Sequence, residues 1–353
     1  MSERIQTIFF KNKPYIISAF SIAGKKESEG PMKNWFDYCI KDDTYGEKTW
    51  EKSESKMLKT AMNEVVAKAG KNHSEIGAML SGDLLNQLMS SSFMARDMHI
   101  PFLGMYGACS TMTESLMLGS VLVDGRYSDN VIIGASSHYC TAERQFRMPL
   151  EHGNQRPPSA QWTATAAGAM LISQSDCKYS DVINIENEMV NSKKIRVESG
   201  TIGKIIDAGV KDANQMGSAM APAAVDTVLN HLQDTKRTID YYDVVLTGDL
   251  GFTGKEIVKD FLADAGIKQS DVDKVYDDCG AMMYTSQQDI HSGGSGCGCS
   301  ASIFSGYVYK KLRRGDIKRA LIISTGALLS TISPFQGESI PGIAHAISLE
   351  SED

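Results

Sequence analysis

Two stretches of the chain carry the same hydrophobic pattern and are each followed by the same kind of strand. Residues 55–70, "SKMLKTAMNEVVAKAG", and residues 222–235, "PAAVDTVLNHLQDT", place apolar side chains at i, i+3 and i+4 spacing, which predicts amphipathic helices. "AMLSGDL" (78–84) follows the first and "VVLTGDL" (244–250) the second. Each reads as a short apolar strand that ends in a small residue, Gly, Asp and Leu.

Further pairs extend this repeat. Cys109 aligns with Cys299, and "NVIIGAS" (130–136) then falls on "ALIISTG" (320–326). "TAAGAMLIS" (165–173) and "GIAHAISLE" (342–350) read as alternating small-residue strands that close each copy. Strands that alternate with helices indicate an α/β protein with a mostly parallel sheet. We therefore expect two duplicated halves in an α/β/α/β/α layered arrangement, with both cysteine-bearing turns near its centre.

The expected boundaries follow from this repeat. The first half covers residues 1–175 and the second 176–353. Residues 25–55 are charged and aromatic and read as a surface insertion, while 138–162 read as a cap loop. Residues 187–220 are polar and contain glycine, and we expect them to connect the halves.

Composition narrows the classes of function. The chain has 353 residues, 42% of them hydrophobic, and a net charge of −7 without a basic stripe, which argues against nucleic acid as a partner. The N-terminal segment lacks the continuous apolar run of a signal peptide, and no stretch has the length of a membrane span. Seven cysteines without an export signal indicate reduced thiols, and no metal site is expected.

The stretch "GACST" (107–111) carries the candidate chemistry. It lies between an apolar run and a segment with helical spacing, so Cys109 is expected at a strand-to-helix turn. A thiol there suits a nucleophile. It also suits a small residue fitted at a tight turn, and the residues alone leave both readings open.

The motifs as a set resemble a known family. "GMYGACSTMTESL", "QRPPSAQWTATAAGAML", "MGSAMAPAA", "LTGDLG" and "HSGGSGCGCSA" are similar to the stage V sporulation protein AD family of spore-forming bacteria, within the thiolase fold. The resemblance implies binding of dipicolinic acid (pyridine-2,6-dicarboxylate) rather than catalysis. It also implies a place in a membrane channel complex that loads the forespore and releases the ligand in germination, peripheral location at the spore inner membrane, other membrane subunits as partners, and a homodimer.

Condensing enzymes of this fold need a His and an Asn besides the Cys. The resemblance places the His at Gly248 or Asp249 and the Asn at Ser295 or Gly296. Two of the three groups are therefore missing, and we expect no enzymatic activity. His291 is the nearest substitute base, so a condensing or acyl-transfer enzyme that uses Cys109 remains the alternative. A third interpretation is a scaffold that docks membrane subunits through residues 25–55.

Seven residues are the expected ligand-binding set. Cys109 and Ser110 open one helix, where free N–H groups face an anion, and Ser295 lies in the related glycine-rich turn. Asp83 would hold Ca²⁺ that enters with the ligand, or it caps the following helix. His291 would supply a proton or a positive charge, or it is structural. Arg147 and Arg156 would pair with the carboxylates. No cofactor is expected beyond Ca²⁺ carried with the ligand.

Overall fold

Two sets of five strands with the same order and directions form the framework. The computed structural model describes residues 5–146, 156–175 and 192–353. The first set runs β2-β8-β6-β4-β5 and the second β9-β14-β13-β10-β11. In both sets, the last three strands in this order are parallel to one another, and the other two neighbouring pairs are antiparallel. The first set is β2 (Tyr15–Ala23), β4 (Ala78–Gly82), β5 (Phe102–Gly104), β6 (Asn130–Ser137) and β8 (Ala166–Ser173). The second is β9 (Lys194–Thr201), β10 (Val244–Thr247), β11 (Tyr276–Asp278), β13 (Arg319–Ala327) and β14 (Gly342–Glu352).

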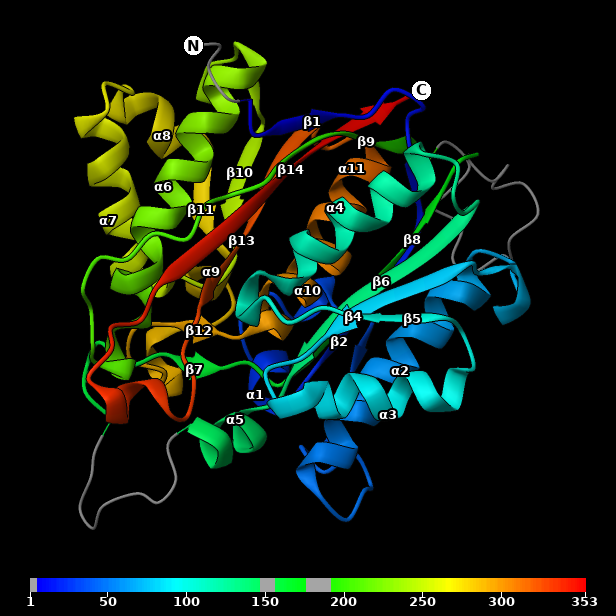
Figure 1. The fold of residues 1–353 in the computed structure, drawn as a ribbon, viewed down its shortest axis with the longest axis horizontal. Helices are drawn as coiled ribbons and strands as arrows, with labels where there is room; N and C mark the ends of the chain where they lie inside the picture. Colours follow the sequence, from blue (N-terminus) through cyan, green and yellow to red (C-terminus); the bar gives the residue numbers. More distant parts are fainter. Residues whose placement is uncertain (1–4, 147–155, 176–191) are drawn as a thin grey trace.

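Helices cover these strands in three layers, which confirms the expected five-layer α/β class. The expectation of a mostly parallel sheet was wrong, because four of the eight strand pairs in the two sets are parallel and four are antiparallel. The helices α2 (Trp50–Lys68) and α3 (Met89–Met98) lie on the outside of the first set, and α6 (Met216–Thr235) and α7 (Gly251–Asp264) on the outside of the second. Between the sets lie α4 (Thr111–Asp124) and a continuous helical run made of α10 (Cys297–Ile303), the π-helical turn η9 (Phe304–Val308) and α11 (Tyr309–Arg314) (Figure 1). The two sets join where β2 meets β9.

The remaining elements are short. They are β1 (Thr7–Phe9), α1 (Lys25–Ser28), β3 (Tyr38–Cys39), α5 (Tyr139–Phe146), β7 (Trp162–Thr163), α8 (Gln269–Val275), α9 (Cys279–Met282) and β12 (Gly294–Ser295), with 3-10 turns between some of them. Among the described residues, no helix is long and apolar enough to cross a membrane.

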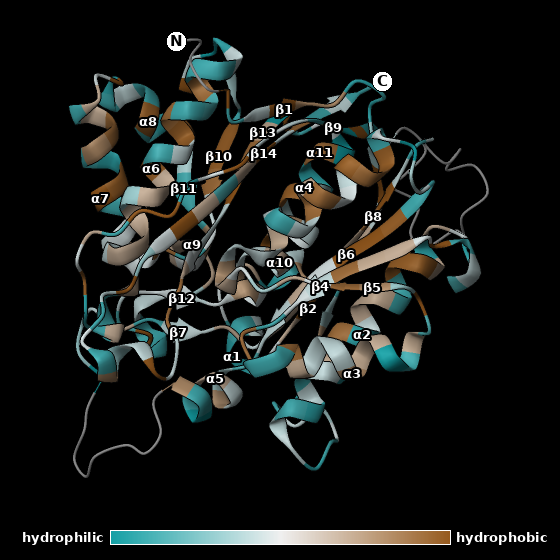
Figure 2. Ribbon diagram, viewed as in Figure 1, coloured by the Kyte–Doolittle hydropathy of each residue, from teal (hydrophilic) through white to brown (hydrophobic). Residues whose placement is uncertain are grey.

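The hydrophobic pattern explains why the central strands and helices form where they do. Every residue of β6 and β8 is buried, because helices cover both faces, and both strands are brown over much of their length in Figure 2. The helix α2 buries the stripe predicted from the sequence, including Met57, Leu58 and Met62. It begins at Trp50, before the predicted start, because the Thr49 side chain accepts a hydrogen bond from the Lys52 N–H at 3.3 Å.

Small residues let the central helical run approach the strands. A Cβ on Gly168 of β8 would lie 2.1 Å from the Ala301 carbonyl oxygen of α10. The sequence "GCGCSA" therefore serves close helix-to-strand packing, which places the beginning of α10 beside the end of β6.

The structure departs from three of the expected segments. Residues 138–162 are not wholly a loop, since they include the helix α5 and the first residue of β7. Residues 187–220 are not only a connection, since Lys194–Thr201 forms β9, the first strand of the second set. Residues 25–55 are not wholly an insertion, since the first turn of α2 lies within them. The division at residue 175 stays a prediction, because residues 176–191 lie outside the described residues.

Candidate functional site

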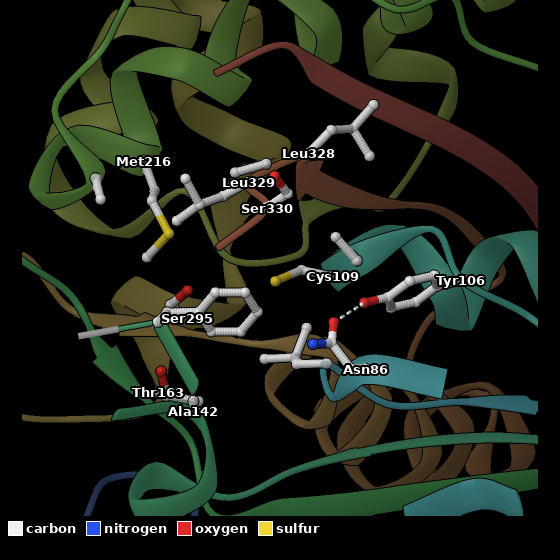
Figure 3. Close-up of a pocket in the computed structure, with 15 residues that line it drawn as sticks. Asn86, Tyr106, Cys109, Ala142, Thr163, Met216, Ser295, Leu328, Leu329 and Ser330 are labelled. Atoms are coloured by element: carbon white, nitrogen blue, oxygen red, sulfur yellow. Dashed lines mark hydrogen bonds between the residues drawn. The ribbon is translucent and has the colours of Figure 1, made fainter. Parts of the chain in front are cut away.

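A cavity of about 240 Å³ opens at the turn that carries Cys109. It lies at the start of α4, and the Cys109 sulfur points into it from one side while Met216 and Ser295 face it from the other (Figure 3). Its lining is mainly apolar, with Leu84, Ala108, Ala142, Phe146, Ala213, Met216, Ala327, Leu328 and Leu329. The polar lining residues are Asn86, Tyr106, Cys109, Thr163, Ser295 and Ser330. Such a site suits an apolar molecule with a few polar groups.

The backbone before Cys109 is held in a strained conformation. Ala108 has φ +51°, in the left-handed region, which costs a residue other than glycine roughly 1–2 kcal/mol. The turn aims the Cys109 side chain at the cavity, although only 6% of the residue is exposed. Ser110 follows, but its hydroxyl donates to the Gly107 carbonyl at 2.7 Å. The predicted pair Cys109 and Ser110 thus contributes its thiol, rather than the hydroxyl, to the cavity.

The side chain next to the thiol is a carboxylate rather than a base of the imidazole type. Asp249 accepts hydrogen bonds from the Gly296 N–H at 2.9 Å and from the Ser295 hydroxyl at 3.3 Å. Its other oxygen accepts from the Thr325 hydroxyl at 2.7 Å. The positions at which the resemblance placed the catalytic His and Asn therefore do meet Cys109, with Asp and Ser in them.

This environment keeps the thiol protonated. Burial raises the pKa of Cys109 well above its ordinary value of 9.0, and the Asp249 charge, the Cys297 thiol and a hydrogen bond to Asp249 raise it further. Burial likewise raises the pKa of Asp249, against the lowering effect of its donors. Because the thiolate is the nucleophilic form, the raised pKa lowers the fraction of Cys109 that is in the reactive form.

Gln161 is a site residue that the sequence reasoning did not single out, whereas Asp249 was named only as one of two positions for the missing His. The Gln161 amide donates to the carbonyl oxygens of Asp249 and Gly294, both at 2.7 Å, and so ties the segment before β7 to the second half. The signal for Asp249 was present, because it aligns with Asp83 in the repeat. Gln161 sits within a quoted motif but has no repeat partner that would mark it.

Asp83 has a local structural role in the described residues. One carboxylate oxygen accepts from the Leu85 N–H at 2.8 Å and the other from the Ser91 N–H at 2.7 Å, so it holds the loop and the first turn of α3. It is fully buried and is not among the side chains that line the cavity. Burial raises the pKa of Asp83. Its ligand role stays a prediction.

His291 and Arg156 lie together, but not at the cavity. The His291 Nδ1 donates to the Pro157 carbonyl at 2.8 Å, and its Nε2 lies 3.2 Å from an oxygen of Asp289. Arg156 donates to the Asp289 carbonyl at 2.6 Å, and its guanidinium lies 5.0 Å from the centroid of the Trp162 ring. Neither side chain lines the cavity.

The remaining predictions concern an arginine and metal. Arg147 lies outside the described residues. Within the described ranges, no group of three His, Cys, Asp or Glu side chains is arranged to hold a metal ion.

Comparisons with known proteins agree with the motifs. The family described as "Stage V sporulation protein AD" matches residues 4–350. The chain is 41% identical over 345 residues to Stage V sporulation protein AD of Bacillus subtilis, covering 98% of this chain and 96% of the relative.

Solved structures show the same fold at low identity. OleA of Xanthomonas campestris with bound cerulenin is similar with a TM-score of 0.60 and 13% identity, over 97% of this chain and 98% of that one. The 3-oxoacyl-[acyl-carrier-protein] synthase III of Aquifex aeolicus is similar with a TM-score of 0.56 and 10% identity, over 96% and 99%. These likenesses confirm the thiolase-like fold.

Proposed function

The chain belongs to the stage V sporulation protein AD family, and from that membership we propose that it is a non-enzymatic subunit that binds dipicolinate in the cavity at Cys109. The observation that carries the proposal is a cavity of about 240 Å³ whose thiol faces a carboxylate instead of an imidazole and has a raised pKa. A condensing site needs a thiolate and a proton acceptor, and a binding site needs neither.

The lining suits a flat ring with polar groups at its rim. Leu84, Met216 and Leu328 offer apolar surface for the pyridine ring. The Asn86 amide offers hydrogen-bond donors for carboxylate oxygens, while the Ser295 hydroxyl lines the cavity and donates to Asp249. The N-terminus of α4, which follows Cys109, adds a favourable dipole for negative charge.

The charge balance favours the calcium chelate over the bare dianion. The described residues that line the cavity include no Lys, Arg or His, and Asp249 lies beside it. A dianion would lose its hydration there without a counter-charge, which is costly. A 1:1 chelate with Ca²⁺ is neutral, so we propose that the cation enters with the ligand.

The wider setting belongs to the same proposal. The protein would act peripherally at the spore inner membrane with other membrane subunits of a channel complex, in uptake during sporulation and release in germination. A homodimer is the proposed oligomeric state. Family membership supports the role in sporulation.

Equilibrium binding tests the proposal on the full chain. Dipicolinate would be titrated with and without Ca²⁺, against benzene-1,3-dicarboxylate, which lacks the ring nitrogen needed for tridentate chelation. Ala142→Phe, which fills the cavity, and the milder Ser295→Ala are expected to weaken binding. His291→Ala is the matched control and is expected to bind as the wild type does.

The same samples, incubated with acetyl-CoA and malonyl-CoA, separate binding from catalysis by intact mass. Saturable, Ca²⁺-dependent dipicolinate binding without an acyl adduct supports the proposal. An adduct lost in Cys109→Ala, together with turnover and no dipicolinate binding, would assign the protein to acyl transfer instead.

A further inference from the structure

A cluster of cations and aromatic rings lies at the end of α11. The Lys311 Nζ lies 5.8 Å from the ring centroid of Trp35 and 5.3 Å from that of Tyr307. The Arg314 guanidinium lies 5.6 Å from the Trp35 ring. The two rings meet edge to face at 4.8 Å. With two neighbouring lysines these side chains form what we call the α11 patch: Trp35, Lys68, Tyr307, Lys310, Lys311 and Arg314.

The patch concentrates positive charge in an acidic chain. Lys68 and Lys310 approach the same Asp37 carboxylate, at 3.0 and 3.2 Å. Lys310 also donates to the Trp35 carbonyl at 2.6 Å. Burial lowers the pKa of Lys310, and the charges of Lys68 and Arg314 lower it further. Two of the four cations of the patch therefore pair with Asp37, and the other two, Lys311 and Arg314, lie over aromatic rings, in a protein whose net charge is −7.

We propose that the α11 patch is the surface through which this protein lies on an anionic lipid bilayer. Anionic headgroups attract clustered Lys and Arg side chains over a Debye length. Trp and Tyr rings, with an apolar body and a polar edge, settle at headgroup depth, and the long stems of Lys and Arg extend past them to the phosphates.

The aromatic rings favour a bilayer over an acidic protein partner. An acidic protein surface would attract the Lys and Arg side chains by charge alone and would not need aromatic rings beside them. Here the exposed Arg314 and the half-buried Lys311 each lie over the Trp35 ring. Apolar and cationic groups are therefore side by side, and this combination suits the boundary between lipid headgroups and water.

The patch is separate from the cavity. The helical run from Cys297 to Arg314 begins beside Ser295 of the cavity and ends at the patch (Figure 1). At 1.5 Å per residue its two ends are roughly 25 Å apart. The proposal therefore stands or fails independently of dipicolinate binding.

Flotation of the full chain with vesicles tests the proposal. The vesicles would be phosphatidylglycerol mixed with phosphatidylcholine, and phosphatidylcholine alone. The variant is Lys311→Gln with Arg314→Gln. The control, Lys268→Gln with Lys274→Gln, makes the same change of net charge at and near α8. Removing each patch cation is expected to lower partitioning about fivefold, and higher salt is expected to weaken binding of the wild type.

The outcomes are distinct. Binding to anionic vesicles alone, lost in the patch variant and kept in the control, supports the proposal, provided that the patch variant melts at the same temperature as the wild type. Equal binding to neutral vesicles, equal loss in both double variants, or no vesicle binding overturns it. Patch-dependent binding to polyglutamate without vesicle binding would reassign the surface to an acidic protein.

Discussion

Replacement of Glu54 by Gln is expected to raise the stability of the protein at neutral and alkaline pH. Glu54 is buried on α2, 2.7 Å from the Thr141 hydroxyl and 3.2 Å from the Ser136 hydroxyl. The Thr141 hydroxyl also lies 2.9 Å from the His138 carbonyl. A protonated Glu54 can donate to Thr141, which then donates to His138, so the geometry fits a neutral carboxyl that glutamine can replace.

The size of the effect follows from the pKa. Burial, and then the charge of Asp83, raise the pKa of Glu54 from 4.5 to about 8. Below about pH 4.5 both the folded and the unfolded chain keep the proton. Between 4.5 and about 8 only the folded chain keeps it, so the free energy of unfolding falls as the pH rises. Over the range from pH 5.5 to 8.5 the loss from this group is about 3 kcal/mol.

Urea denaturation at several pH values in that range measures this loss. The Glu54→Gln variant should lose about 3 kcal/mol less than the wild type between the two ends. Glu64→Gln, on the exposed face of the same helix, is the matched control and should follow the wild type. Parallel curves for Glu54→Gln and the wild type would show that Glu54 is ionised in the folded protein and would refute the reasoning.

Three further predictions follow from single sites. Asp249→Asn removes the charge beside Cys109 and should speed its alkylation by iodoacetamide severalfold at pH 8, measured by intact mass; an unchanged rate would contradict the assigned pKa. Gly251 has φ +66°, and a Cβ there would lie 2.0 Å from a carbonyl oxygen, whereas Gly266 has φ +89° and no atom near its Cβ position. In urea denaturation, Gly251→Ala should therefore lower the free energy of unfolding by at least about 2 kcal/mol more than Gly266→Ala does. Burial lowers the pKa of His231 to about 4, so the contribution of this group to the free energy of unfolding should fall by about 3 kcal/mol from pH 6.5 to 4. His231→Gln should therefore lose about 3 kcal/mol less stability than the wild type over that range, measured by urea denaturation.

The repeat in the sequence determined the architecture. Short apolar strands joined by amphipathic helices can bury their apolar faces in only a few layered arrangements. A second copy of the same pattern forms the same layered arrangement again. The sequence therefore predicted the five layers, and it located Cys109 at the strand-to-helix turn. Once the family pattern was applied, it also placed Gly248 or Asp249 at the position of the His and Ser295 or Gly296 at that of the Asn, and the structure shows that Asp249 and Ser295 lie at the thiol.

Tertiary structure alone decided where the polar side chains point. Asp83 and Asp249 occupy equivalent places in the repeat, yet one binds backbone N–H groups before α3 and the other faces Cys109. His291 is four residues from Ser295, but it lies against Asp289 instead of the cavity. Side-chain direction depends on turn geometry and on partners distant in the chain, and hydrophobic periodicity carries neither. The α11 patch likewise joins residues 35, 68 and 307–314, which no local pattern connects.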